Sequence, residues 1–147
     1  MPGRFKYEKL VKYPHLKPEE VPIWERFIDL VPDAYQSVDY DVGVGDVSEA
    51  KEVAEKLEIA GAEATFQYKI DVVGFAAGRI DIIDIKPRAH PAANGQVKGY
   101  VTMFKKKFNP REILRPVIIA GDKFTEAESL AAEAGVALII VWYNFWS

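Results

Sequence analysis

The sequence predicts a single α/β domain whose central mixed sheet of about five strands is flanked by helices, and three observations lead to this fold class. Two runs rich in Ile and Val within 66–86 are joined by a short Gly/Ala turn inside Gly74–Gly78, which indicates a hairpin. Near the C-terminus a strand, a helix and another strand follow one another, which favours a parallel crossover. The chain of 147 residues is the length of one domain with a substantial core.

The first part of the chain provides an arm, a helix, a strand and a second helix. Residues 1–17 are basic and aromatic without clear periodicity, so we interpret them as an N-terminal arm that precedes a domain over 18–147. Apolar spacing predicts a helix within Pro18–Val31, beginning near Val21 because Pro22 suits a first helical turn. The alternating segment Ser37–Gly43 predicts a strand, and a capping-box pattern predicts a helix from Asp46 that ends near Gly61.

After the hairpin the chain alternates between helices and strands. A helix is expected from Ala92 to Lys106, and the run Pro116–Ala120 is apolar enough for a buried strand. A helix over Phe124–Ala134 would end at Gly135, and Val136–Val141 would form the last strand. The aromatic tail 142–146 either fills the core or forms a contact between subunits.

Amino-acid composition excludes several kinds of metal site and indicates where in the cell the protein is found. The chain has no cysteine, which excludes disulfides and thiolate zinc sites, and its only histidines are His15 and His90, so a histidine-rich metal site is not expected. No apolar run approaches the length of a membrane span, and the N-terminus lacks the apolar region of a signal peptide. We therefore expect no membrane association and a cytoplasmic location, or a virion-associated one if the chain is phage-encoded.

The distribution of charge indicates a partner more clearly than the net charge of −3 does. Residues 86–116 contain eight Lys and Arg against Glu112, whereas 18–85 contain sixteen acidic residues against five basic ones. A basic segment of this kind is compatible with a nucleic-acid backbone lying along the helix. For Lys105, Lys106 and Lys107 taken alone, a solvated cluster at a helix C-terminus is the favoured explanation, because the helix dipole attracts cations there.

Four charged residues interrupt the apolar hairpin strands, and buried strands rarely carry unpaired charge. Asp84 and Lys86 share one face of their strand, and Asp81 lies on the other. If the hairpin loop has an even number of residues, Asp71 faces position 82 and lies diagonally from Asp84 on the same face. Two close carboxylates repel each other, and Mg²⁺, which prefers oxygen ligands, would remove that cost. Lys86 would then stand beside the metal and orient or deprotonate a water molecule.

These residues and their order resemble the PD-(D/E)XK nuclease superfamily. In that superfamily an Asp on one strand precedes a (D/E)-x-K on the next, as Asp71 precedes Asp84-Ile85-Lys86 here. The segment Gln96-Val97-Lys98-Gly99-Tyr100 is similar to the Q-x-x-x-Y helix of the branch with recombination-type exonuclease domains. Two positions differ from the common pattern, because Ile70 stands where Pro is usual and Asp84 where Glu is more frequent.

The resemblance implies a restriction-endonuclease-like fold over roughly 37–141, in a small member of phage or resolvase type. It implies Mg²⁺ or Mn²⁺ on Asp71, Asp84 and the carbonyl of Ile85, with Lys86 placing the attacking water. The family usually supplies another acid from its first helix, for which Glu25 is our candidate, with Glu20 and Asp41 as reserves. The expected catalytic set is completed by Gln96, and the expected DNA contacts are Arg88, Lys98, Tyr100 and Lys105.

The leading hypothesis is therefore a metal-dependent nuclease that hydrolyses phosphodiester bonds in DNA and acts as a homo-oligomer, a dimer or a virion assembly. An alternative from another class is a nuclease-like fold that serves as a structural or DNA-binding component, for example of a phage particle. A third interpretation, in which the buried charges form only a structural salt-bridge network, is weaker because buried ion pairs are costly.

Overall fold

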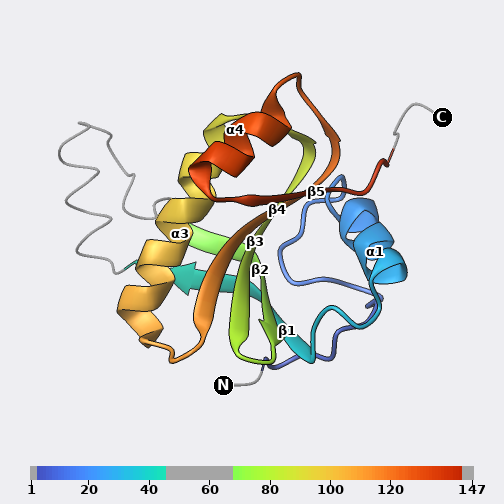
Figure 1. The fold of residues 1–147 in the computed structure, drawn as a ribbon. Helices are drawn as coiled ribbons and strands as arrows, with labels where there is room; N and C mark the ends of the chain where they lie inside the picture. The colour runs from blue at the N-terminus through green and yellow to red at the C-terminus, as the bar shows by residue number, and fades with distance from the viewer. Residues whose placement is uncertain (1–2, 46–67, 144–147) are drawn as a thin grey trace, which may run out of the picture.

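The computed structural model describes residues 3–45 and 68–143. Five strands form one sheet in the spatial order β1-β2-β3-β4-β5, with three described helices packed on it (Figure 1). Their bounds are α1 Val21–Leu30, β1 Ser37–Val44, β2 Tyr68–Ala76, β3 Arg79–Ala89, α3 Ala92–Phe108, β4 Ile113–Lys123, α4 Ala127–Ala134 and β5 Ala137–Ile140. The helix predicted from Asp46 to Gly61 lies outside the described residues.

The sheet is mixed, as the sequence predicts. β1, β2 and β3 are antiparallel neighbours, whereas β3, β4 and β5 are parallel. The two parallel connections each contain a helix, because a chain that returns to the same end of a sheet needs a crossover. The five-stranded α/β architecture is therefore confirmed.

The hairpin between β2 and β3 closes through a loop of two residues, Ala77 and Gly78. Ala76 lies opposite Arg79, and Gly78 has a φ of 70°, a conformation that glycine adopts without steric cost. The loop has an even number of residues, which is the condition under which Asp71 and Asp84 share a face. The pairing of the two strands is, however, shifted by two residues from the expected one. Val73, and not Asp71, lies opposite Ile82.

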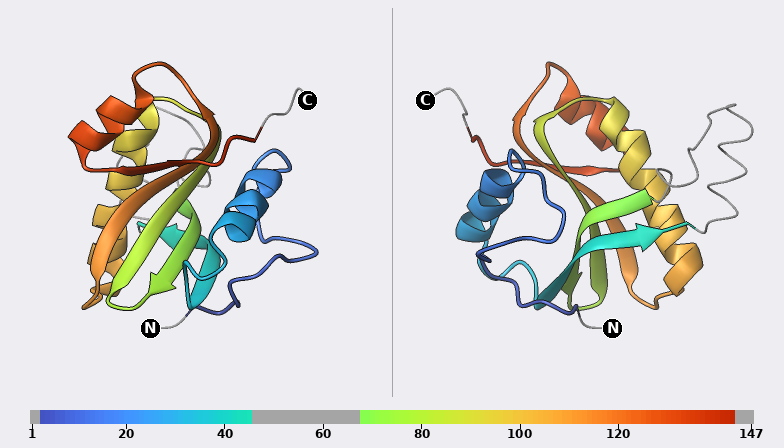
Figure 2. Two further views of the ribbon diagram at one scale, coloured as in Figure 1. Left: turned by 45° about the vertical axis from the view of Figure 1, so that its right-hand side comes forward. Right: turned by 180° about the vertical axis from the view of Figure 1, so that it is seen from behind.

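Two hydrophobic cores lie on opposite faces of the sheet. Helices α3 and α4 cover one face, and α1 with residues 3–20 covers the other (Figure 2, left). The first core contains Ile80 and Ile82 of β3, and the second contains Ile83 and Ile85, as alternation along a strand requires. The sheet is thus buried on both sides, which explains why its strands are so apolar.

The alternation of side chains breaks at one position in both β1 and β2. Tyr40 and Val72, which lie opposite each other, pack in the core under α1, whereas Val42 and Ile70, two residues away on the same strands, pack in the core under α3. Asp41 lies between Tyr40 and Val42 with a positive φ of 54°. The described ends of β1 and β2 consequently turn toward α3, which Figure 2 (right) shows from behind.

Residues of the N-terminal arm are held by the domain itself. Phe5 and Val38 exchange two backbone hydrogen bonds of 3.0 Å each, so the arm adds a bridge to the outer edge of β1. Tyr13 is buried among the aromatic side chains of α1 and β1, with its ring 5.5 Å from that of Tyr40. These contacts account for the ordered arm within one chain.

Helix α4 begins at Ala127, three residues later than the sequence suggests. The N–H of Phe124 donates to the carbonyl of Ala89 at 3.0 Å, which holds Phe124 beside the end of β3. Glu126 has a φ of 70° and cannot belong to a regular helix. In the part of the chain that the structure describes, no helix is long and apolar enough to cross a membrane.

Candidate active site

Asp71 and Asp84 meet where the pairing of β2 with β3 ends. The register runs from Ala76 opposite Arg79 to Val72 opposite Ile83, and one further step along it places Asp71 opposite Asp84. Their carboxyl groups are close enough for each to alter the pKa of the other. The two acids are therefore nearer than the diagonal arrangement expected from the sequence.

A backbone group of β3 also turns to this pair. The N–H of Ile85 donates to Oδ2 of Asp71 at 2.9 Å. A side chain thus takes a hydrogen bond at the point where the strand ladder stops, and the strands separate there. The separation leaves the backbone of Asp84 and Ile85 next to the carboxyl groups.

Lys86 provides a cation beside the pair. Its Nζ lies 3.5 Å from Oδ2 of Asp84, and its side chain is 26% exposed. That carboxylate oxygen is buried and has no hydrogen-bond donor in good geometry among the described residues. Buried polar atoms nearly always have a partner, so this oxygen is available to a ligand.

Burial and mutual repulsion alter the acidity of both carboxyl groups. Burial and the neighbouring Asp84 raise the pKa of Asp71 to about 7. Burial also raises the pKa of Asp84, although the ammonium of Lys86 opposes the shift. The pair therefore retains a proton near neutral pH, because two adjacent buried carboxylates cannot both ionise cheaply.

Glu20 is the third acid of this region. It is buried at the start of α1, and its Oε1 accepts a hydrogen bond of 3.0 Å from the N–H of Lys17. Burial raises its pKa, and the charge of Asp71 raises it further, whereas Lys86 lowers it. Glu20, the reserve candidate, is thus within electrostatic reach of the pair.

Glu25 lies elsewhere. The hydroxyl of Tyr13 donates to its Oε2 at 2.7 Å, so this carboxylate binds an aromatic side chain of the arm. Five residues separate Glu20 from Glu25, which is well short of two helical turns, so the two side chains leave α1 in different directions. The apolar stripe of the helix did not reveal this, because Glu20 precedes its first turn.

Gln96 and Tyr100 bring helix α3 to the site. The amide of Gln96 donates to the hydroxyl of Tyr100 at 2.8 Å, one turn further along the helix. Burial raises the pKa of Tyr100, and the charges of Asp84 and Asp71 raise it further, which places the phenol in their field. Tyr100 is buried, so it contacts the site from inside the protein. The sequence suggests a surface contact to DNA at this position, and its burial does not fit that expectation.

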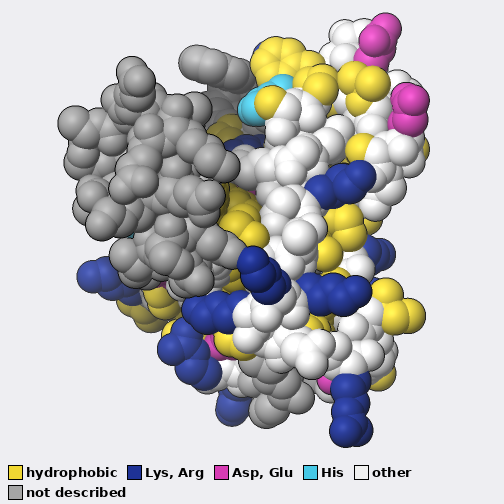
Figure 3. Space-filling view, turned by 90° about the vertical axis from the view of Figure 1, so that its left-hand side faces the viewer, with side chains coloured by type: hydrophobic (Ala, Val, Ile, Leu, Met, Phe, Trp, Pro, Cys, Tyr) yellow, Lys and Arg dark blue, Asp and Glu magenta, His cyan; other side chains and the backbone are white. Residues whose placement is uncertain are grey.

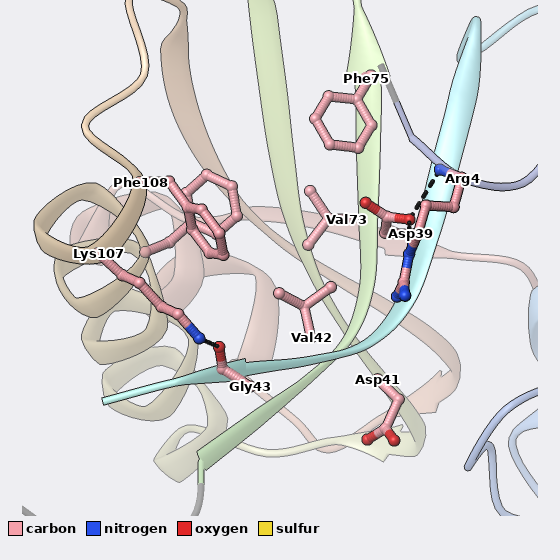
Figure 4. Close-up of a pocket in the computed structure, with 10 residues that line it drawn as sticks. Arg4, Asp39, Asp41, Val42, Gly43, Val73, Phe75, Lys107 and Phe108 are labelled. Atoms are coloured by element: carbon pink, nitrogen blue, oxygen red, sulfur yellow. Dashed lines mark hydrogen bonds and ion pairs between the residues drawn. The ribbon is translucent and has the colours of Figure 1, made fainter. Parts of the chain in front are cut away.

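Asp39 and Asp41 are bound to other cations. Asp39 pairs with Arg4 of the arm at 3.1 Å, and Asp41 lies 3.5 Å from Lys69. Figure 4 shows their carboxyl groups pointing in different directions beside a cavity of about 260 Å³ between β1 and the end of α3. Asp41, the other reserve acid, is therefore paired with Lys69 and not with a residue of the Asp71–Asp84 site.

Asp81 belongs to a separate polar cluster on the opposite face of β3. It is fully buried, and it accepts hydrogen bonds from Arg79, Arg115 and the hydroxyl of Tyr35, the shortest at 2.7 Å. The sequence suggested only that Asp81 lies apart from the site. Arg79 lies two residues before Asp81 on the same strand, whereas Arg115 comes from β4, which no local pattern indicates.

The basic residues expected to bind DNA have unequal environments. Lys98 and Lys105 are exposed on α3, seven residues and so about two turns apart. Figure 3 shows Lys and Arg side chains in a band over the lower part of this face, where α3 ends, whereas Asp and Glu lie at its top right. Arg88 pairs with Asp122 at 3.1 Å and is therefore partly neutralised.

The donor groups suit a hard divalent cation. Asp71 and Asp84 offer carboxylate oxygens, one of them buried without a hydrogen bond, and such oxygens are the ligands that Mg²⁺ prefers. Among residues 3–45 and 68–143, no three His, Asp or Glu side chains are gathered tightly enough to form a full ligand cluster. A cation would therefore be held by the pair and by the carbonyl of Ile85, with Glu20 as a more distant acid.

The site residues stand on the architecture expected from the sequence. A mixed five-stranded sheet carries Asp71 on β2 and Asp84-Ile85-Lys86 on β3, and α3 with Gln96 and Tyr100 follows. No family model matches the sequence, and no curated protein matches it either.

One solved structure supports this fold. A repair endonuclease from Pyrococcus abyssi is similar to this chain with a TM-score of 0.52 and 17% identity, over 88% of this chain and 49% of that one. A structure described as EndoMS in its apo form matches with a TM-score of 0.41 and 21% identity, over 50% of this chain and 32% of that one. The chain thus spans about half or less of these proteins, and the first likeness confirms the restriction-endonuclease-like fold.

Proposed function

We propose that the chain is a metal-dependent nuclease that hydrolyses phosphodiester bonds in DNA. The observation that carries this proposal is the pair Asp71–Asp84, with a buried carboxylate oxygen that lacks a hydrogen bond and lies 3.5 Å from the ammonium of Lys86. A purely structural ion pair would be expected to satisfy that oxygen. The shared fold with the Pyrococcus abyssi repair endonuclease supports the same reaction class.

Each residue has a distinct task in the proposed reaction. Asp71, Asp84 and the carbonyl of Ile85 hold the cation, and the hydrogen bond from Ile85 N–H fixes the direction of the Asp71 carboxylate. Mg²⁺ or Mn²⁺ bound there supplies positive charge that polarises the scissile phosphate and offsets the charge developing on its oxygens. Lys86 positions the water that attacks phosphorus, and its proximity to Asp84 keeps its ammonium at the site.

Residues around this centre hold the substrate and the acids in place. Gln96 is exposed on α3 and offers its amide to a phosphate oxygen or to the attacking water, while Tyr100 holds that amide from inside. Glu20 takes the role that the sequence assigned to Glu25, because it lies in the field of Asp71 and Lys86. Lys98 and Lys105 contact the DNA backbone along α3.

A cleavage assay tests the proposal. The purified chain is incubated with supercoiled plasmid, single-stranded DNA and branched DNA in Mg²⁺, in Mn²⁺ and in EDTA. Wild type should cleave at least one substrate with metal and none with chelator, and Lys86→Ala or Asp84→Asn should lower the rate by about 100-fold or more. The exposed pair Lys9–Asp29 provides matched controls, so Lys9→Ala and Asp29→Asn should cleave as wild type does.

Other results would count against the nuclease. Cleavage that persists undiminished in Lys86→Ala removes Lys86 from the mechanism and indicates a contaminating enzyme. Complete absence of cleavage with every substrate, together with stable DNA binding or a large assembly, would support a non-catalytic component. The homo-oligomer and the virion association stay predictions, and light scattering on the purified chain measures the first.

A further inference from the structure

Phe124 lies exposed beside the end of β3, where Ala89 stands three residues past the proposed water-positioning lysine. Its ring is 46% exposed, although large aromatic side chains are usually well buried in a single domain. The hydrogen bond from its N–H to the carbonyl of Ala89 fixes its backbone to β3. Because two strand residues span about 7 Å, the backbone of Arg88 is about one nucleotide's reach from that of Lys86.

Arg88 and His90 support this ring. The guanidinium of Arg88 lies 4.9 Å from the ring centroid, a cation–π distance, and the imidazole of His90 approaches with its centroid 6.4 Å away at an angle of 63°. Arg88 is fastened in turn by Asp122, which lies opposite it in β4. The exposed ring is therefore held in place and is not a mobile surface side chain.

The surrounding charge distinguishes the kind of group that would bind. Asp122 partly neutralises Arg88, Lys123 pairs with Glu128 at 3.1 Å, and Glu126 lies exposed just beyond Phe124. The cations beside the ring are thus paired with acids and leave no excess positive charge for a phosphate, whereas a neutral flat ring needs none. Bases stack on aromatic and guanidinium planes in proteins that bind unpaired strands.

We propose that Phe124, backed by Arg88 and His90, is a stacking platform for an unpaired nucleobase next to the scissile phosphate. This inference rests on the proposed nuclease function, because it places the platform beside the same phosphate. The bound strand then runs along α3, with its base on the platform near the start of the helix and its backbone over Lys98 and Lys105 toward the end. The role of Arg88 changes from the phosphate contact expected from the sequence to support of a base.

Binding in EDTA tests the platform separately from cleavage. Fluorescence anisotropy gives the Kd of a short single-stranded oligonucleotide and of a set in which one nucleotide at a time is abasic. Wild type should lose affinity, by about tenfold, when the base is removed at one or two adjacent positions. In Phe124→Ala that sensitivity should vanish, so that the normal and abasic oligonucleotides bind equally.

Four further variants test the platform more closely. Phe124→Leu keeps an apolar side chain without a ring and should behave as Phe124→Ala, whereas Phe124→Tyr should retain the base dependence. Leu130→Ala, which removes an exposed apolar side chain on α4, is the matched control and should bind as wild type does. Lys105→Ala should weaken all oligonucleotides alike and reduce the salt dependence of Kd.

The possible outcomes separate the two proposals. Equal loss of affinity for normal and abasic DNA in Phe124→Ala, or no change at all, would overturn the platform even if the chain cleaves DNA. A base-dependent loss in a chain that cleaves nothing would support the platform as a binding site and refute the nuclease. No DNA binding by wild type would overturn both.

Discussion

The N–H of Ile85 donates its hydrogen bond to the carboxylate of Asp71, 2.9 Å away, at the step after the last paired residues of β2 and β3. Asp71 thereby interrupts the hydrogen-bond ladder between β2 and β3, and the same ladder holds it opposite Asp84. A regular hairpin would keep the backbone of β3 occupied along its whole length. At this step the backbone of β3 is bonded to a side chain of β2 and not to its backbone.

Ionisation of Asp71 should destabilise the metal-free protein. Its pKa rises from an ordinary 3.8 to about 7 on folding, so between these pH values the folded state binds more protons than the unfolded state. The contribution of Asp71 to the free energy of unfolding is therefore greatest below about pH 4 and falls as the pH rises through 7. Asp71→Asn should remove this fall and be more stable than wild type by about 1–3 kcal/mol at pH 8.

Denaturant unfolding in EDTA at pH 5 and pH 8 measures this difference. The gain of Asp71→Asn should be larger at pH 8, whereas Asp29→Asn, at an exposed ion pair, should follow wild type at both values. An equal effect of Asp71→Asn at the two pH values would show that Asp71 does not titrate in this range.

Divalent metal should stabilise the fold through the carboxyl pair. A ligand that binds only the folded state raises stability by RT ln(1 + [L]/Kd), about 2.7 kcal/mol when its concentration is 100 times Kd. Mg²⁺ or Mn²⁺ at millimolar concentration should therefore raise the Tm of wild type, and EDTA should reverse the rise. Asp84→Asn should show no rise in calorimetry, and a rise of wild-type size in that variant would place the metal elsewhere.

Glu20 and Glu25 offer a comparison within one helix. Glu20→Gln should lower the cleavage rate by about tenfold or more, because it removes a charge near Asp71 and Lys86. Glu25→Gln should leave the rate nearly unchanged and cost about 1 kcal/mol of stability, through a weaker hydrogen bond to Tyr13. Rates measured at saturating metal test both, and the reverse order would restore Glu25 as the first-helix acid.

The buried carboxylate of Asp81 should matter for stability and not for cleavage. Asp81→Asn leaves the guanidinium groups of Arg79 and Arg115 without their anion, and because both are about 40% exposed the cost should be about 2 kcal/mol. Asp122→Asn removes the partner of Arg88 at an exposed pair and should change stability much less than Asp81→Asn does. Unfolding at pH 7 measures both, and a large loss of activity in folded Asp81→Asn would contradict this separation.

Local patterns were sufficient to predict the helices and strands of the described residues and the convergence of Asp71 with Asp84. Alternation along β3 separates Asp84 and Lys86 from Asp81, and an even hairpin loop brings Asp71 to the right face. The register could not be derived, because any loop of even length satisfies the same parity. The two-residue turn at Ala77–Gly78 had to be observed.

Features that depend on tertiary packing were beyond the sequence. The choice between Glu20 and Glu25 depends on Tyr13 of the arm, whose hydroxyl donates a hydrogen bond to the carboxylate of Glu25. Phe124 looked like the first residue of a helix, but its bond to Ala89 and the left-handed Glu126 keep it outside α4. In both cases a contact between residues distant in sequence outweighs the local pattern.

The break in alternation at Asp41 and in β2 places Asp71 on the boundary between two separately packed interiors. A carboxylate at such a boundary depends on the rigidity of both sides, so looser packing under either α1 or α3 displaces the same group. Loss of activity can then arise from substitutions that never touch DNA or metal, and tolerance of this chain to mutation is set by two cores at once.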